Sequence, residues 1–326
     1  MVINKESKRY KWIKNHAVEL MAYGGLAFCL IMFTILTPMF GVSIWSPKKL
    51  ATLMSDVIVL ALASVGAVFP YALGAKDISI GKQIGLYATL FIVLGNLTDS
   101  LWPGIIVSLA IAMFIAVVNG AAGDILHIVS IIPSVVFMMI LSGISTIIYV
   151  NMNTRNIALR TIDFRIFKSP WFMLAVLVAE TIIVYYLFNY TKLGKNVKAI
   201  GANQQAAKLS GVNIIKYKIL AYVVMGVCVV IAALFQMGYT GSASDSTGTG
   251  FEMNVMVALI LGGMPLSGGM RSKVSCALVG SFTYSLLDVG LPMIGVSAYQ
   301  VFLFKAILFL IIVCITCRSP KGPLPR

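Results

Sequence analysis

The chain has 326 residues, of which 59% are hydrophobic and 11% are charged, and its net charge is +14 at pH 7. Soluble domains carry about 25% charged residues to cover their surface, so this composition excludes a soluble fold and predicts an integral membrane protein. The positive charge does not indicate nucleic-acid binding, because Lys and Arg are not interleaved with aromatic residues and instead collect in the cytoplasmic loops of membrane proteins.

Because about 20 apolar residues span the bilayer core as a helix, the sequence predicts an all-α, polytopic protein with about ten transmembrane helices. The expected segments, in chain order, are 18–40, 50–72, 84–97, 102–118, 131–150, 171–190, 219–239, 253–266, 274–289 and 299–317.

Two of these segments, 84–97 and 253–266, are too short to cross comfortably, and each adjoins a glycine-punctuated polar stretch. Short or broken segments often line a substrate path, because irregular backbone survives at membrane depth only beside protein or water. A tight helix–helix turn, with glycine allowing close packing, explains the same pattern equally well.

The distribution of basic residues predicts the topology. With the N-terminus inside, 18 Lys and Arg fall on the inner side and 6 on the outer side. We therefore expect both termini in the cytoplasm. The expected organisation is a cytoplasmic segment 1–17, one transmembrane domain 18–317 with a cytoplasmic loop 191–217, and a cytoplasmic tail 318–326.

The loop 191–217 contains a candidate amphipathic helix. Asn203 is expected to cap a helix of about two turns, and Gly211 to supply its left-handed end. A helix this short is not stable alone. One apolar face is formed by residues three and four positions apart, with one more adjoining: Ala206, Leu209, Ser210 and Ala207. We expect a partner protein to cover this face.

The same stretch resembles the coupling-helix region of the permease subunits of sugar-type ABC importers, the ribose/xylose/galactose branch of binding-protein-dependent transport permeases. The matching positions are Gly201, Asn203, Ala206, Ala207, Ser210, Gly211 and Asn213. Further blocks follow in the family's order: GAKDISIG at 74–81, VVNGAAGDILHIVSIIPS at 117–134, and GTGFEMNVMVALILGGMPLSGGMRSKV at 248–274. The resemblance extends over about residues 50 to 315.

The resemblance implies a permease subunit of an ATP-driven importer in the bacterial cytoplasmic (inner) membrane. It also implies cytoplasmic ATPase subunits, a second permease subunit and an extracytoplasmic binding protein as partners. The ATPases are expected to dock on Gly201, Asn203, Ala206, Ala207, Leu209, Ser210 and Gly211. Ala75-Lys76 replaces the usual paired glycines, and Met264 and Met270 interrupt the late block. These departures favour a heterodimer, although a homodimer stays open.

A charged residue at mid-bilayer costs about 2.5–3.5 kcal/mol, so each one needs a functional reason or a local partner. Pairing of Asp288 with Lys305 is one such local explanation. The candidate residues for a solute pathway are Asp56, Asp77, Asn119, Glu180, Gln236, Asn254 and Asp288.

Two other functions stay open. An ion-coupled secondary transporter would use Asp56 or Glu180 as the proton carrier. An integral membrane enzyme would need a catalytic constellation, and none stands out. The sequence has no P-loop and no metal-ligand spacing, so we expect no enzyme activity, cofactor or metal in this chain, with ATP used by a partner subunit.

Overall fold

The computed structural model describes residues 5–41, 43–160, 162 and 164–316. These residues form an all-α membrane fold, as expected, with a single two-stranded sheet. The elements in chain order are α1 (Lys5–Met39), α2 (Pro47–Ala72), α3 (Ile80–Thr98), α4 (Trp102–Ile125), α5 (Ile131–Asn151), β1 (Asn156–Ala158), the 3-10 helix η1 (Arg165–Lys168), α6 (Pro170–Asn189), α7 (Lys192–Ala202), α8 (Gln204–Leu209), α9 (Ile214–Thr240), β2 (Ser242–Ser244), α10 (Phe251–Leu261), α11 (Ser275–Met293) and α12 (Ala298–Thr316).

Within the described residues, eight helices are long and apolar enough to cross a membrane. They are Leu20–Met39 of α1 and the helices α2, α3, α4, α5, α6, α9 and α11. A helix satisfies its own backbone hydrogen bonds, which is why apolar runs adopt it in lipid. α12 is apolar along its 19 residues, and α10, with 11 residues, is too short to cross alone.

Of the two segments that the sequence predicts to be short, the structure confirms one. The segment 253–266 is short, because α10 ends at Leu261. The expectation for 84–97 is wrong, because α3 begins at Ile80 and has 19 residues. The polar residue Gln83 lowers the hydropathy of this region, but its side chain finds hydrogen-bond partners inside the protein. Its amide donates to the Ser79 hydroxyl at 2.7 Å, and its carbonyl oxygen accepts from Tyr87 at 3.2 Å.

The N-terminal segment 1–17 is not separate from the first span in the described part of the chain. α1 begins at Lys5 and continues without a break to Met39. Residues 1–4 of that segment and the expected tail 318–326 lie outside the described residues.

α2 and α9 form the centre of the bundle. Residues 57–72 of α2 are all buried, and α9 packs against both α2 and α4. Glycine allows the close approach of these helices. A Cβ at Gly66 of α2 would lie 2.4 Å from the Cβ of Cys228, and one at Gly120 of α4 would lie 2.6 Å from the Cα of Ile219. Small residues at such crossings are typical of helix packing in membranes.

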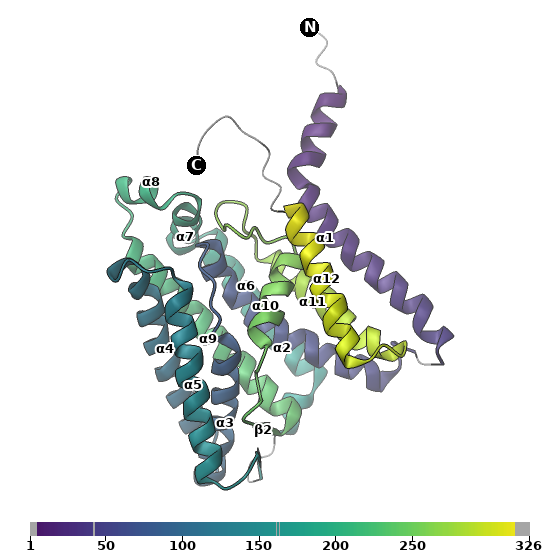
Figure 1. Ribbon diagram of the computed structural model, residues 1–326, viewed down its shortest axis with the longest axis vertical. Helices are drawn as coiled ribbons and strands as arrows, with labels where there is room; N and C mark the ends of the chain where they lie inside the picture. Colours follow the sequence, from purple (N-terminus) through teal and green to yellow (C-terminus); the bar gives the residue numbers. More distant parts are fainter. Residues whose placement is uncertain (1–4, 42, 161, 163, 317–326) are drawn as a thin grey trace.

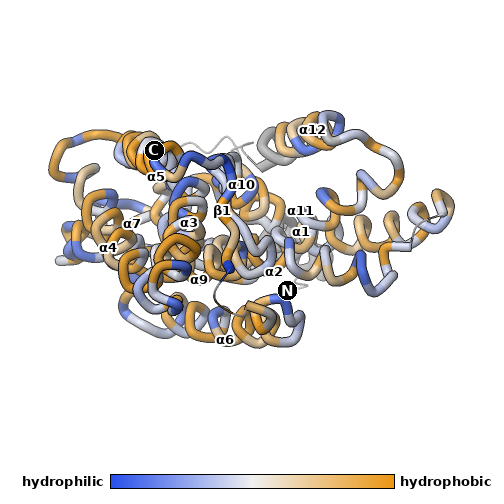
Figure 2. The backbone as a smooth tube through the Cα atoms, turned by 90° about the horizontal axis from the view of Figure 1, so that it is seen from below, coloured by the Kyte–Doolittle hydropathy of each residue, from blue (hydrophilic) through white to orange (hydrophobic). Residues whose placement is uncertain are grey.

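The peripheral helices expose apolar side chains, as lipid-facing surfaces do. Figure 2 shows hydrophobic residues along α4 and α6, which lie at the outside of the bundle. Phe114 of α4 and Ile182 of α6 are exposed by 63% and 62%. These faces would be unfavourable in water, so they fit a bilayer.

The bundle has two distinct ends (Figure 1). The first turns of α1, the end of α12 and the helices α7 and α8 lie at one end, which we call the α8 end. β1 pairs antiparallel with β2 at the opposite end, which we call the strand end. This arrangement agrees with the expectation that the helices nearest both termini and the 191–217 loop share one side.

Candidate functional site

α8 has the cap and the stop that its sequence predicts. The Asn203 side-chain oxygen accepts from the Ala206 backbone N–H at 3.0 Å. Gly211 has a φ of +81°, the left-handed conformation that ends a helix. The N–H groups of Gly211 and Val212 then return to the carbonyls of Lys208 and Ala207 at 3.0 and 3.1 Å. These bonds hold a six-residue helix that could not persist alone.

The two apolar sides of α8 have different environments. Ala207 is only 6% exposed and packs with Ile200 of α7 and Ile214 of α9. The expectation that Ala207 adjoins the uncovered face is therefore wrong, because α7 and α9 cover its methyl group. Leu209 is 91% exposed, and Ala206 and Ser210 are exposed beside it. Leu209 is thus the large apolar side chain that α8 presents outward.

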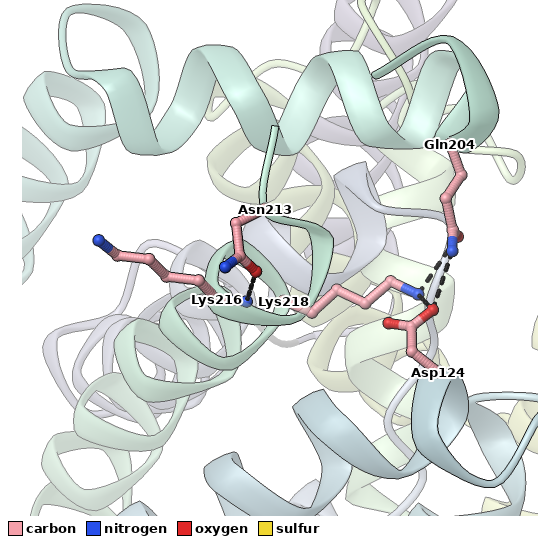
Figure 3. Close-up of polar contacts among 5 residues, drawn as sticks. All are labelled: Asp124, Gln204, Asn213, Lys216 and Lys218. Atoms are coloured by element: carbon pink, nitrogen blue, oxygen red, sulfur yellow. Dashed lines mark hydrogen bonds and ion pairs between the residues drawn. The ribbon is translucent and has the colours of Figure 1, made fainter. Parts of the chain in front are cut away.

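A polar cluster ties α8 to two transmembrane helices (Figure 3). The Lys218 ammonium on α9 lies 2.9 Å from Asp124 Oδ1 at the end of α4. The Gln204 amide donates to the same oxygen at 2.8 Å, and its carbonyl oxygen accepts from Lys218 at 3.2 Å. We call Asp124, Gln204 and Lys218 the α8 clamp.

The ion pair of the α8 clamp is largely shielded from water, while Gln204 is exposed. The Lys218 and Asp124 side chains are 10% and 16% exposed. Removing one partner of a buried ion pair leaves an uncompensated charge, so the pair resists separation. Asn213 stiffens the same corner, because its side chain accepts from the Lys216 N–H at 3.0 Å and caps α9 (Figure 3). The α8 clamp therefore connects α8 to both α4 and α9.

A second connection joins α7 to the centre of the bundle. Gly201 lies so close to the end of α2 that a Cβ there would be 1.9 Å from the Ala72 carbonyl oxygen. The same oxygen accepts from the Gly269 N–H at 2.8 Å. Gly269 belongs to the turn between α10 and α11. Three regions distant in sequence therefore meet at one carbonyl, which explains why Gly201 cannot carry a side chain without displacing its neighbours.

Asp77 and Asn119, two of the candidate pathway residues, come together near the α8 end. The Asn119 amide donates to Asp77 Oδ2 at 3.2 Å. The N–H and the hydroxyl of Ser79 donate to Asp77 Oδ1 at 2.7 and 2.6 Å. Burial raises the pKa of Asp77, and the hydrogen bonds from Ser79 and Asn119 oppose that rise. The burial of Asp77 and its full set of donors indicate a structural joint between two sequence blocks.

Two further candidate pathway residues, Asn254 of α10 and Asp288 of α11, lie in another region. Asn254 accepts a hydrogen bond from Tyr284, whose hydroxyl also accepts from Lys305 at 2.9 Å. Lys305 forms an ion pair with Asp288, as the sequence suggested. Asp56, half-buried on α2, lies close enough to Asp288 for their charges to interact.

The remaining candidates lie apart from these groups. Glu180 of α6 is buried beside the Cys228 thiol, and Gln236 is half-buried on α9. The seven candidate residues therefore do not form one site. In the described part of the chain, no group of three His, Cys, Asp or Glu side chains could hold a metal ion.

Sequence reasoning missed the α8 clamp. Asp124 and Lys218 are 94 residues apart, and no motif links them. The available signal was an acidic residue in the last turn of an apolar helix. At such a position a charge requires a partner, and Lys218 near the start of α9 was one of several basic candidates on the same side.

The sequence of this chain is similar to those of known transport permeases. Residues 49–315 match a family described as branched-chain amino acid transport system / permease component. The ribose import permease protein RbsC of Escherichia coli K12 is 26% identical, over 97% of this chain and 98% of the relative. The galactose/methyl galactoside import permease protein MglC of Haemophilus influenzae is 25% identical, over 93% and 96%. The L-arabinose transport system permease protein AraH of E. coli K12 is 28% identical, over 76% of each chain.

Proposed function

This chain belongs to the family described as branched-chain amino acid transport system / permease component, and from that membership we propose that it is the transmembrane subunit of an importer driven by separate ATPase subunits. The proposed mechanism is alternating access. ATP binding draws the ATPases together, α8 moves with them, and the helix bundle opens to the other side. ATP hydrolysis takes place in the partner, and this chain supplies the path.

The observation that carries the proposal is the attachment of α8. Leu209 is 91% exposed at its tip, while the α8 clamp fixes its base to α4 and α9. A partner's groove that covered Leu209 would remove this apolar side chain from water, as in other helix-in-groove contacts. A helix joined rigidly to two spans is suited to carry a partner's motion into the membrane.

The proposed solute is a monosaccharide or a sugar-like molecule. The relatives named above are permeases for ribose, galactose or methyl galactoside, and L-arabinose. The family description mentions branched-chain amino acids. We favour a sugar as the solute, because all three relatives are named as permeases for sugars.

The proposed setting is the bacterial cytoplasmic (inner) membrane, with the α8 end in the cytoplasm. The 18-to-6 distribution of basic residues supports this orientation. A second permease subunit, the same chain or a different one, would complete the path, and an extracytoplasmic binding protein would deliver the solute to the strand end. The alternative of an ion-coupled carrier through Asp56 or Glu180 is not favoured, because the named relatives are import permeases.

Reconstitution tests the proposal. The chain would be placed in liposomes with candidate ATPase and binding-protein subunits, and uptake of labelled ribose, galactose and L-arabinose would be measured. We expect uptake that requires ATP and is insensitive to collapse of the proton gradient. Uptake that continues without the ATPase and stops when the proton gradient is removed would contradict it.

A further inference from the structure

The segment between β2 and α10 is not helical, although it packs along the transmembrane helix α3. β2 pairs with β1, and Asn96 near the end of α3 donates to the carbonyl of Ala158 in β1 at 2.9 Å. Six residues after Ser242, Gly248 touches Gly81 near the start of α3, where a Cβ on Gly248 would lie 2.0 Å from the Gly81 carbonyl oxygen. The segment therefore runs back along α3, from its last turns toward its first turn. Figure 1 shows it rising from β2 to α10.

Glycines hold this segment directly against α3. A Cβ at Gly85 would lie 2.2 Å from the Thr247 carbonyl oxygen, and one at Gly81 would lie 2.3 Å from the Gly248 carbonyl oxygen. Gly248 and Gly250 have φ values of +78° and +81°, which only glycine adopts readily. The non-helical backbone is thus a packed feature of the bundle, and it continues into α10 as one broken span.

A set of polar side chains lies on the open side of this segment. They come from α3, α5 and the segment itself, and we call them the Asp245 cluster: Lys82, Thr146, Asp245, Ser246 and Thr249. The Thr146 hydroxyl lies 3.1 and 3.2 Å from the two carboxylate oxygens of Asp245. The Lys82 ammonium donates to the Thr249 hydroxyl at 3.0 Å and to the Asp245 carbonyl oxygen at 3.4 Å.

The Asp245 cluster lies at membrane depth and is open to its surroundings. Thr146 is five residues before the end of α5, and Lys82 is near the opposite end of α3, so the cluster is between the two ends. Asp245, Ser246, Thr146 and Thr249 are exposed, and Lys82 is half-buried. A carboxylate and unwound backbone are not tolerated against lipid tails, but they are tolerated where they line water.

We propose that the Asp245 cluster lines the solute path and binds a neutral polyhydroxylated solute, an inference that rests on the proposed transport function. The cluster offers one negative and one positive group together with three hydroxyls, so its formal charge is balanced. Sugar hydroxyls both donate and accept, and they match such alternating partners. Asp245 accepts from the solute, and Lys82 donates to it. Neither residue is among the pathway candidates that the sequence predicts.

The same helix supplies a matched control for the exposure of the cluster. Ile144 lies two residues before Thr146 and is 42% exposed, but it lines an apolar groove with Phe114 and Ile140. Thr146 and Ile144 thus lie on different faces of α5. Their depths along the helix differ by only about 3 Å. Water should reach Thr146, while lipid should cover Ile144.

Thiol accessibility in the assembled importer tests the water path. The five cysteines would be replaced, and Thr146→Cys and Ile144→Cys would be treated with a positively charged, membrane-impermeant methanethiosulfonate. We expect Thr146→Cys to react at least about ten-fold faster, because a thiol in apolar surroundings remains protonated and inert. Equal rates at the two positions, whether fast or slow, would overturn the proposal.

Solute protection and kinetics test the binding role. Ribose, galactose and L-arabinose would each be added during labelling, and we expect one of them to slow modification of Thr146→Cys. Asp245→Asn should raise the half-saturating solute concentration for uptake about ten-fold, since a hydrogen bond to a charged group is lost. Labelling without protection by any sugar, or Asp245→Asn uptake kinetics equal to wild type, would contradict solute binding. Because labelling needs no ATP, its result stands whether or not ATP-driven import is observed.

Discussion

Lys218 and Asp124 form an ion pair of 2.9 Å that joins the first turns of α9 to the last turn of α4. Gln204, the first residue of α8, hydrogen-bonds to both members. The pair therefore anchors the first residue of α8 to α4 and α9. Under the proposed mechanism, this pair would pass motion of α8 to the two spans.

Breaking the clamp on one side should destabilise the protein. Asp124→Ala leaves Lys218 as an uncompensated charge that is 8% exposed, and a loss of about 3 kcal/mol in the free energy of unfolding is expected. The combined variant Asp124→Leu with Lys218→Met removes both charges and should recover most of that loss. Chemical unfolding of the purified protein in detergent measures both. A double variant less stable than Asp124→Ala would contradict this account of the pair.

Leu209→Ser should weaken attachment of the ATPase without affecting folding. The side chain is 91% exposed, so its truncation removes little packing within this chain. An apolar anchor at the centre of an interface contributes about 2 kcal/mol, which corresponds to roughly a thirty-fold loss of affinity. Gln205→Ser, an exposed change on the same helix, is the control. Co-purification of the ATPase with each variant provides the measurement, and equal recovery from the two variants would remove Leu209 from the interface.

Gly201→Ala should disturb the joint between α7, α2 and the α10–α11 turn. The new methyl group would lie 1.9 Å from the Ala72 oxygen and 2.9 Å from the Gly269 nitrogen, so the backbone must move, at a cost of about 1–3 kcal/mol. Gly25→Ala on α1 meets no atom within 4 Å and should be neutral or slightly stabilising. Thermal unfolding of the two variants in detergent distinguishes them. Equal midpoints would show that the contact at Ala72 is not tight.

The pKa of Asp77 predicts a pH dependence of stability. Burial raises this pKa above its ordinary value of 3.8, so the folded state holds the proton more tightly than the unfolded state does. The contribution of Asp77 is therefore fully present below about pH 4 and is lost as pH rises through the raised pKa. Asp77→Asn keeps the acceptor for Ser79, and the Asn119 side chain can turn its unpartnered oxygen to the new amide.

The stability of wild type relative to Asp77→Asn should thus fall as pH increases above about 4 toward the raised pKa of Asp77. Unfolding midpoints of both proteins across this range measure the difference. A difference that is constant with pH, or that grows with pH, would show that Asp77 is not held in the environment described.

The parts of the fold that could be foreseen are those governed by local sequence. Apolar runs located the spans, and Asn203 with Gly211 fixed both ends of α8, because capping depends on neighbouring residues alone. The sequence did not predict the start of α3, because its first turns contain polar residues. The Gln83 side chain donates a hydrogen bond to the Ser79 hydroxyl, and hydropathy cannot detect that contact. The roles of Asp124, Lys82 and Asp245 depend on contacts between distant segments. No single-chain pattern records those contacts.

The placement of Ala207 shows a second limit. Helical spacing identifies which residues share a face but not which face the rest of the chain covers. Ile200 and Ile214 cover Ala207, and only the folded arrangement of α7 and α9 reveals this. Among the coupling candidates, Leu209 therefore remains as the apolar contact offered to a partner.

Site-specific cross-linking tests the central claim most directly. Leu209→Cys in a cysteine-free chain would be combined with single cysteines in the groove of the ATPase subunit and exposed to a short bifunctional thiol reagent. Asn153→Cys at the strand end would be the control. We expect Leu209→Cys to cross-link to the ATPase in a manner that changes with added ATP, and Asn153→Cys not to cross-link. No cross-link from Leu209→Cys in a complex that still performs ATP-driven uptake would contradict the role of α8.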